Sequence, residues 1–154
     1  MGMVKGHDRR DRATHSTSSQ SAGAPLLYVV DDDVATVDLL CDVASEAGWS
    51  SMGFLRLAGL RAALDEEVPT LVILDDELPD GRGGDLAREL RDDARTTDVP
   101  LLICTSAPPR RLAEIGSWAP VVAKPFDLRE IEDVLVAAAA QAAPQQRRSL
   151  DRAG

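Results

Sequence analysis

Short apolar runs recur along this chain, and each of them ends in polar residues. The clearest runs cover residues 26–30, 71–74, 101–104 and 121–123. Continuous apolar runs of this length are typical of strands that are covered on both faces, as in a parallel sheet. A weaker run over 49–54 adds a fifth expected strand.

The segments between the runs have helical spacing. Asp33 is the expected N-cap of the first helix, and Gly48 stands where a C-cap glycine belongs. Between them, apolar residues recur along one helical face: Val37, Leu40, Ala44 and Ala47. Four further helices are expected: about 57–64, from Asp85 onward, 110–116, and 128–142 with Asp127 as its cap.

This alternation of strands and helices favours an α/β fold with helices on both faces of a parallel sheet. We expect a flavodoxin-like (βα)5 three-layer sandwich with strand order 2-1-3-4-5, the common five-stranded arrangement. The domain is expected over residues 25–142. The flanking segments, 1–24 and 143–154, are expected to be disordered tails, because they lack a periodic apolar pattern.

Composition narrows the class of protein. The chain has 154 residues, of which 44 % are hydrophobic, enough for one domain with its own core. No apolar stretch approaches the ~20 residues that cross a bilayer, and residues 1–24 lack the apolar centre of a signal peptide. The expected location is therefore the cytoplasm, without membrane insertion. The net charge of the whole chain is −9, and because both tails are basic, the domain between them is more negative still, which disfavours nucleic acid as its partner.

Cysteine and histidine do not suggest a site. Cys41 and Cys104 lie in apolar contexts and are expected to be buried thiols. His7 and His15 both lie in the N-terminal tail. A zinc site or a histidine-based active site is therefore disfavoured.

Carboxylates follow two of the apolar runs. Asp31 and Asp32 come directly after the first strand, and Asp75 comes directly after the third. The carboxyl ends of parallel strands lie at one edge of a sheet, where ligands bind. Carboxylates gathered there repel one another, and a hard divalent cation such as Mg²⁺ relieves the repulsion while accepting phosphate oxygens.

A hydroxyl and a lysine follow two other runs. Thr105 ends the fourth strand, and Lys124 follows the fifth. Only Lys5 and Lys124 are lysines among the 17 Lys and Arg residues, so a lysine in the folded region is unusual. A lysine suits a place where a compact point charge meets a phosphoryl oxygen. For Thr105 the alternative interpretation is a hydroxyl bonded to the local backbone.

Four segments together resemble the receiver domain of two-component response regulators: VVDDD at 29–33, LVILDDELPDGRGG at 71–84, PLLICTS at 100–106 and KPF at 124–126. Their order and spacing make the similarity specific over residues 26–142. The resemblance implies that Asp75, four residues before Pro79, is the phosphoacceptor.

The resemblance also implies roles for the other candidates. Thr105 would be the switch hydroxyl and Lys124 the phosphate-sensing lysine. The Mg²⁺ site would comprise the acidic pair, the acceptor and a backbone carbonyl: Asp31, Asp32, Asp75 and Glu77.

The function implied is signalling rather than turnover catalysis. Asp75 would accept a phosphoryl group from a sensor histidine kinase or a histidine phosphotransfer protein, and water would later remove it. The twelve residues after Ala142 are too few for an effector domain. We therefore expect a single-domain response regulator that signals by phosphorylation-dependent binding of a downstream protein, and not an enzyme.

The chain departs from the family pattern near the fifth strand. Receiver domains usually carry an aromatic switch residue three positions before the lysine, and Val121 stands there instead. Trp118 is the aromatic residue nearby, and we expect it to cover the core. The run 134–140 is apolar on more than one side, which predicts a homodimer or partner contact on the strand-four-to-helix-five face.

Two alternatives remain open. A receiver fold could serve as a phosphorylation-independent binding module, which the residue at 121 favours and the intact acidic set opposes. A phosphatase of the haloacid-dehalogenase type also uses an aspartate after an apolar strand. That class expects Asp-x-Asp near the start of the chain, whereas Asp75 lies mid-chain.

Overall fold

The structure is a computed structural model that describes residues 23–153. The prediction of disorder over 1–24 falls almost entirely on residues outside this range. The first strand begins at Leu26, one residue after the expected start of the domain.

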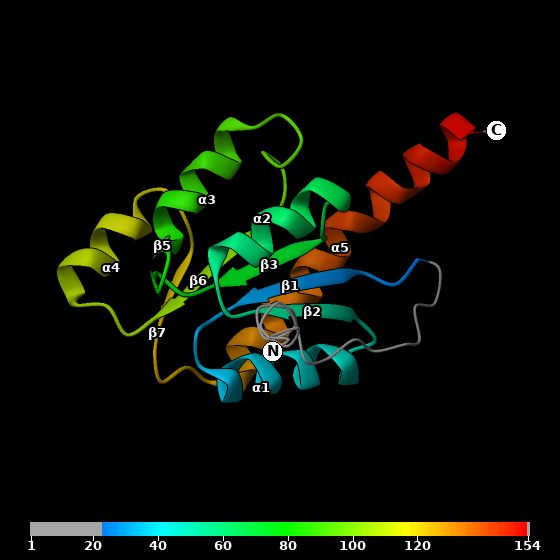
Figure 1. Cartoon of the computed structure of the whole chain (residues 1–154). Helices are drawn as coiled ribbons and strands as arrows, with labels where there is room; N and C mark the ends of the chain where they lie inside the picture. Colours follow the sequence, from blue (N-terminus) through cyan, green and yellow to red (C-terminus); the bar gives the residue numbers. More distant parts are fainter. Residues whose placement is uncertain (1–22, 154) are drawn as a thin grey trace, which may run out of the picture.

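All the long strands join one parallel sheet with the order β2-β1-β3-β6-β7 (Figure 1). Counted along the chain without the two short strands described below, this is the predicted order 2-1-3-4-5. The sheet strands lie at or within one residue of the predicted runs: β1 Leu26–Val30, β2 Ser50–Phe54, β3 Leu71–Leu74, β6 Leu101–Thr105 and β7 Val121–Ala123.

Five helices cover the two faces of the sheet, and their bounds are α1 Val34–Glu46, α2 Leu57–Glu66, α3 Gly83–Asp92, α4 Pro109–Gly116 and α5 Leu128–Ala153. Helices α1 and α5 pack on one face, and α2, α3 and α4 pack on the other (Figure 1). The flavodoxin-like three-layer sandwich is therefore confirmed.

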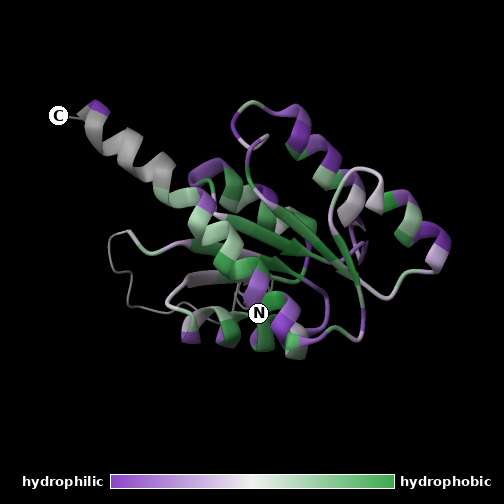
Figure 2. Cartoon of the chain, turned by 180° about the vertical axis from the view of Figure 1, so that it is seen from behind, coloured by the Kyte–Doolittle hydropathy of each residue, from purple (hydrophilic) through white to green (hydrophobic). Residues whose placement is uncertain are grey.

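The core consists of two clusters separated by the sheet. One joins the sheet to α2, α3 and α4, and the other joins it to α1 and α5. Successive residues of β3 alternate between them, with Leu74 in the first cluster and Ile73 in the second. The sheet strands other than β2 are mostly hydrophobic, whereas the helices carry their polar residues outward (Figure 2). Cys41 and Cys104 are buried free thiols, as predicted.

Helix α1 begins and ends as the sequence predicts. Asp33 is its N-cap and accepts a hydrogen bond from the backbone N–H of Ala35 at 3.3 Å. Gly48 follows its end with φ +85°, a left-handed conformation that favours glycine. Ala47 is exposed, so its predicted place on the buried face is wrong. It lies in the C-cap, where the chain leaves the helix.

The segment after β3 is more ordered than the predicted loop. Glu77–Leu78 (β4) and Gly81–Arg82 (β5) pair as a small antiparallel hairpin. Helix α3 then begins at Gly83, two residues before the predicted start at Asp85.

Helix α5 begins at Leu128 as predicted but continues to Ala153. The predicted end at Ala142 and the disordered tail over 143–154 are therefore wrong for the backbone up to residue 153. The alanines, glutamines and arginines of this segment have good helix propensity, which favours continuation of the helix. No helix in the described residues is long and apolar enough to cross a membrane.

Candidate functional site

The register of the sheet brings the carboxylates together. Val30 and Leu74 are partners in the β1–β3 pairing, so the residues that follow them emerge side by side at the carboxyl edge. The backbone N–H of Asp75 donates to the carbonyl of Val30 at 2.9 Å, which continues the ladder past the strand. Asp31 and Asp75 are thus fixed by the strands that precede them.

Three carboxylates meet at this edge. Asp31, Asp32 and Asp75 each offer an oxygen, and these oxygens lie within 4.8 Å of one another. Asp31 and Asp75 are buried, at 2 % and 6 % exposed, whereas Asp32 faces solvent. The convergence that the sequence predicts for these three residues is therefore present.

Lys124 completes the cluster from the end of β7, the edge strand of the sheet. Its Nζ donates to Asp31 Oδ2 at 2.6 Å and to Asp75 Oδ2 at 3.1 Å. The β6–β7 pairing sets its position, because its backbone N–H donates to the carbonyl of Thr105 at 2.9 Å. The peptide bond from Lys124 to Pro125 is cis.

Burial and charge pull the pKa values of this cluster in opposite directions. Burial raises the pKa of Asp31 above its ordinary value, and the bonds from Lys124 and from the backbone of Asp33 offset this only in part. Burial lowers the pKa of Lys124, but its bonds and charge interactions with Asp31 and Asp75 outweigh that effect and leave the pKa raised. The lysine is therefore held as a cation between the two buried carboxyls.

The remaining oxygens show which groups are free to bind a ligand. Asp75 Oδ1 accepts from the backbone N–H of Glu77 at 3.2 Å, and Asp31 Oδ1 accepts from that of Asp33 at 2.9 Å. Within the part of the chain that the structure describes, the Asp32 carboxylate has no hydrogen-bond or ion-pair partner.

Three carboxylates against one lysine leave an excess of negative charge, and all the donors are oxygens. Such a set fits Mg²⁺, which binds one or two carboxylates and keeps positions for water and phosphate oxygens. The backbone of Glu77 lies next to this cluster, because its N–H donates to Asp75 Oδ1, whereas the Glu77 side chain is exposed.

Thr105 lies where the sequence predicts, as the last residue of β6, and it is fully buried. Its hydroxyl accepts a hydrogen bond from the backbone N–H of Ala107 at 3.2 Å. Among the described residues, no hydrogen bond joins this hydroxyl to Asp75 or Lys124. The structure thus shows the local backbone bond that was the alternative interpretation.

A second charged group, which the sequence pattern did not indicate, lies beside the acceptor. The Asp76 side chain is 0 % exposed, and both of its oxygens accept from Arg111 of α4, at 2.8 and 2.9 Å. The backbone N–H of Gly84 donates to the same carboxylate at 3.0 Å. The signal for this pair was weak, because a charged residue in a loop is normally solvated and the two residues are far apart in the chain.

Val121 and Trp118 both pack against the cluster under α2, α3 and α4, and both are half-buried. Trp118 Nε1 donates to the carbonyl of Gly84 at 3.2 Å. The prediction that Trp118 covers the core is confirmed.

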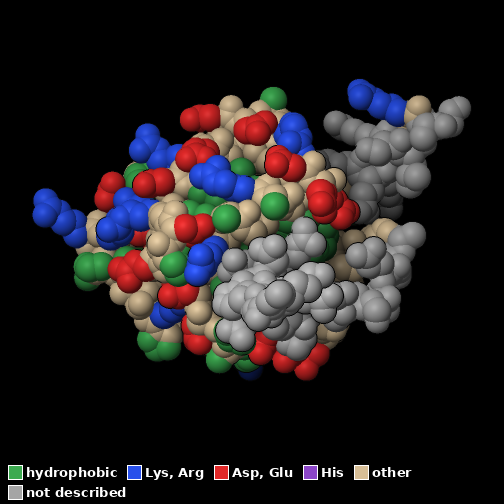
Figure 3. Space-filling model, viewed as in Figure 1, with side chains coloured by type: hydrophobic (Ala, Val, Ile, Leu, Met, Phe, Trp, Pro, Cys, Tyr) green, Lys and Arg blue, Asp and Glu red, His purple; other side chains and the backbone are tan. Residues whose placement is uncertain are grey.

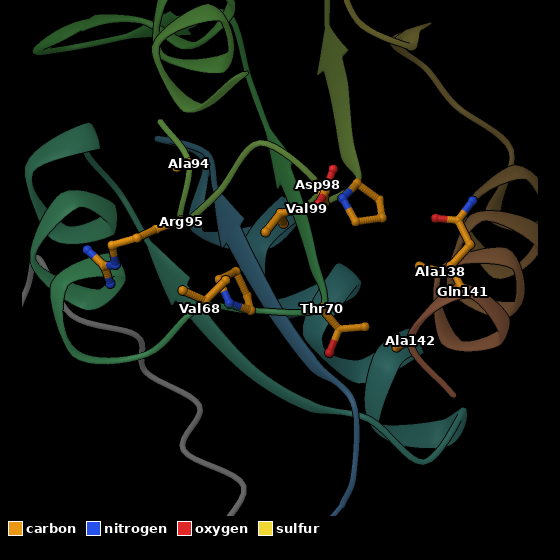
Figure 4. Close-up of a pocket in the computed structure, with 11 residues that line it drawn as sticks. Val68, Thr70, Ala94, Arg95, Asp98, Val99, Ala138, Gln141 and Ala142 are labelled. Carbon is orange, nitrogen blue, oxygen red and sulfur yellow. The ribbon is translucent and has the colours of Figure 1, made fainter. Parts of the chain in front are cut away.

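A cavity of about 370 Å³ lies at the other end of the sheet, away from Asp75. It is lined by the segments that lead into β3 and β6 and by α5, including Thr70, Val99 and Gln141 (Figure 4). Acidic and basic side chains are intermixed on the face shown in Figure 3. Neither feature gathers the reactive groups found at the carboxyl edge.

Comparison with curated proteins identifies relatives over most of this chain. It is 34 % identical over 114 residues to the transcriptional regulatory protein GltR of Pseudomonas aeruginosa, covering 72 % of this chain and 47 % of GltR. It is 30 % identical over 110 residues to the DNA-binding dual master transcriptional regulator RpaA of Synechocystis, covering 70 % of this chain and 46 % of RpaA. The chain spans about half the length of the curated relatives it matches. No protein-family profile matches it.

Solved structures share the fold. The receiver domain of a signal transduction histidine kinase from Syntrophus aciditrophicus superposes with a TM-score of 0.71 at 18 % identity, covering 77 % of this chain and 92 % of that chain. The chemotaxis response regulator CheY4 of Vibrio cholerae gives a TM-score of 0.67 at 17 % identity, covering 75 % and 98 %. The sequence similarity to response regulators, the shared fold and the carboxylate cluster at the sheet edge agree: this chain contains a receiver domain of the response-regulator family.

Proposed function

We propose that this protein is a response regulator whose Asp75 accepts a phosphoryl group from a phosphohistidine on a sensor histidine kinase or a phosphotransfer protein. The observation that carries the proposal is the position of the Asp75 carboxylate. It is buried at a sheet edge, 3.1 Å from the Lys124 ammonium and beside two further carboxylates. A phosphoryl group added there would lie next to a fixed cation.

The proposed step is a nucleophilic displacement at phosphorus. An oxygen of Asp75 forms the new P–O bond, the P–N bond to the donor histidine breaks, and the imidazole leaves with the electron pair. Lys124 already contacts the acceptor and would stabilise the charge on the transferring oxygens. Hydrolysis of the acyl phosphate by water would later restore the carboxylate. The protein would therefore serve as a phosphoacceptor whose phosphorylated form is the signal, rather than as a turnover enzyme.

Asp31, Asp32 and Asp75 would hold Mg²⁺, with the carbonyl of Glu77 as the fourth proposed ligand. The ion would supply charge neutralisation for the phosphoryl oxygens. Asp32 is best placed to bind it directly, because it is exposed and has no partner among the described residues, whereas Asp31 already accepts two hydrogen bonds.

The output that we propose is phosphorylation-dependent binding of a downstream protein, in the cytoplasm where kinases of this class present their phosphohistidine. Thr105 ends the strand beside β3, and its hydroxyl would exchange the bond from Ala107 for one to a phosphoryl oxygen. A homodimer through the face from β6 to α5 remains part of the proposal, since Val136 on α5 is 70 % exposed. Sedimentation with and without a phosphoryl analogue tests this, and a monomer under both conditions at high concentration contradicts the dimer.

The test is phosphorylation by acetyl phosphate in the presence of Mg²⁺. In that reaction Asp75 forms the P–O bond and acetate leaves. We expect one phosphoryl group per chain, mapped to Asp75, and its complete loss in Asp75→Asn. Asp92→Asn is the matched control, because Asp92 is exposed at the end of α3 and remote from the site.

Two outcomes would contradict the proposal. A folded parent protein that takes up no label would favour the phosphorylation-independent binding module. Repeated release of phosphate from an aryl phosphate ester would favour a phosphatase instead.

A further inference from the structure

The buried pair formed by Asp76 and Arg111 connects the acceptor turn to α4. Asp76 directly follows Asp75, and Arg111 lies 35 residues further along the chain. Two parallel hydrogen bonds of 2.8 and 2.9 Å join them. This bidentate geometry fixes both side chains, since the planar guanidinium matches the two carboxylate oxygens.

Asp76 has three partners that offset the cost of burying its charge. They are the guanidinium of Arg111, the backbone N–H of Gly84 at 3.0 Å and, more weakly, Arg82 Nη1 at 3.4 Å. A buried carboxylate that loses its cationic partner is strongly destabilising. Arg111 therefore cannot move without a response from Asp76.

The side chains of Asp75 and Asp76 bond to groups on opposite sides of the sheet. Asp75 bonds to Lys124 on the side of α1 and α5, and Asp76 bonds to Arg111 of α4 on the other side. Their shared backbone is held tightly, because the N–H of Gly83 donates to the Asp76 carbonyl at 3.0 Å. A Cβ at Gly83 would overlap the Asp75 carbonyl oxygen. A single planar peptide unit therefore joins the two aspartates, in a backbone that leaves little room to move.

Helix α4 has little else to hold it in place. Ile115 is the buried residue of this eight-residue helix. Arg111 also contacts Glu114 of the same helix at 3.2 Å, and its guanidinium lies 5.9 Å from the centre of the Trp118 ring. Arg111 therefore contacts both the helix and the indole, which Arg88 of α3 also approaches, at 5.0 Å from the ring centre.

We propose that the Asp76–Arg111 pair carries the phosphorylation state of Asp75 to α4. This inference rests on the proposed function. Phosphorylation replaces a carboxylate by a group of about two negative charges. The added charge repels the Asp76 carboxylate and attracts the Arg111 guanidinium, and the water-excluded setting screens these forces only weakly. Arg111 then shifts relative to Asp76, and α4 and Trp118 follow. This route does not need an aromatic residue at Val121.

The test uses Trp118 as the reporter, in a Trp49→Phe background. Trp49 is 5 % exposed and packs in the other cluster, so its removal leaves one indole beside Arg111. We expect the emission of Trp118 to change when Mg²⁺ and beryllofluoride, a phosphoryl analogue, are added. In the double variant Asp76→Asn/Arg111→Gln, which keeps the volume and removes both charges, we expect most of that change to disappear.

Reciprocity adds a second readout. If the pair couples the two sites, removing it must also change the affinity for beryllofluoride, by about 5-fold or more. Arg110→Gln is the matched control, since Arg110 is exposed on the same helix. It should leave both the emission change and the affinity as in the parent.

The outcomes separate this inference from the proposed function. No labelling of Asp75 in the parent overturns both. Labelling of the double variant with a parent-sized emission change and unaltered affinity overturns the coupling alone. If the double variant does not fold, Arg111→Lys decides, because a lysine keeps the charge but loses the bidentate geometry. A reduced emission change supports the coupling, and an unchanged one overturns it.

Discussion

Asp80 caps the N-terminus of α2, a helix to which it does not belong. It lies in the turn between β4 and β5, yet its two carboxylate oxygens accept from the backbone N–H groups of Leu57 and Ala58, both at 2.9 Å. Arg56, the residue at the N-cap of α2, supplies no capping side chain. Asp80 therefore satisfies the donors that would otherwise be left open at this helix end.

Replacing Asp80 with alanine should destabilise the protein by about 1 kcal/mol at neutral pH, the usual effect of losing a helix cap. Burial raises the pKa of Asp80, but the bonds from Leu57 and Ala58 outweigh it, so the pKa lies below the ordinary value of 3.8. A lowered pKa means that the stabilisation is present above the unfolded-state value and is lost as the pH falls through the folded-state value.

Urea unfolding should therefore give a lower free energy of unfolding for Asp80→Ala than for the parent at pH 7. This difference should narrow as the pH falls below 3.8. Asp92→Ala, at an exposed position, should show no such gap. A constant difference at all pH values would mean that the carboxylate charge plays no part in the cap.

Gly83 is a second residue whose role depends on close approach. A Cβ there would overlap the carbonyl oxygen of Asp75, which is backbone and cannot rotate away. Gly83→Ala should cost about 1–3 kcal/mol, as overpacking does, and should slow labelling of Asp75. Gly59→Ala, inside α2, should instead be neutral or stabilising, because alanine is the better helix former. Equal behaviour of the two variants in unfolding and labelling would contradict this account.

At the scale of elements, α4 is the helix with the least apolar anchorage. Its buried side chain is Ile115, at 0 % exposed, whereas α1 and α3 each bury five residues. A helix held in this way is expected to open locally before the rest of the domain unfolds. The polar link from Arg111 to Asp76 then contributes much of its attachment.

Ile115→Ala should destabilise the domain by about 2–5 kcal/mol, as large-to-small core changes do. Hydrogen exchange should report faster opening over 109–116 than over α5. Ile131→Ala is the matched control, since Ile131 is also 0 % exposed but packs in the other cluster. If both variants open α4 equally, the helix is not anchored through Ile115.

At the scale of the molecule, the carboxyl edge of the sheet concentrates negative charge in a chain whose net charge is already −9. Mg²⁺ bound there should stabilise the folded state by relieving the repulsion between Asp31, Asp32 and Asp75. Binding at 100 times the dissociation constant would add about 2.7 kcal/mol.

The melting temperature should therefore rise with added Mg²⁺ and return to its starting value with EDTA. Asp32→Asn should remove most of the rise without harming the fold, because Asp32 is exposed. Asp42→Asn, on the exposed side of α1, should keep the rise. A Mg²⁺ effect of equal size in both variants would show non-specific binding to acidic groups.

Much of the architecture follows from local pattern. The apolar runs 26–30 and 71–74 are strands because burial on both faces requires continuous apolar residues, and their ends place Asp31 and Asp75 at one edge. The cap at Asp33 and the left-handed Gly48 are likewise decided by residues next to them in the chain. The convergence of the acidic cluster with Lys124 could therefore be predicted from the sequence.

The remaining features depend on residues that meet only after folding. Asp76 and Arg111 are 35 positions apart, and Asp80 and Leu57 are 23 apart. Each contact involves an acidic side chain that would ordinarily face water, and no periodicity marks the two residues as partners. Burial by the assembled layers makes the contact between Asp76 and Arg111 strong, because it removes the solvent that would otherwise satisfy the charges. The sequence by itself thus determined the strands, their order and the acidic site, whereas the tertiary structure alone decided how the acceptor turn is attached to α2 and α4.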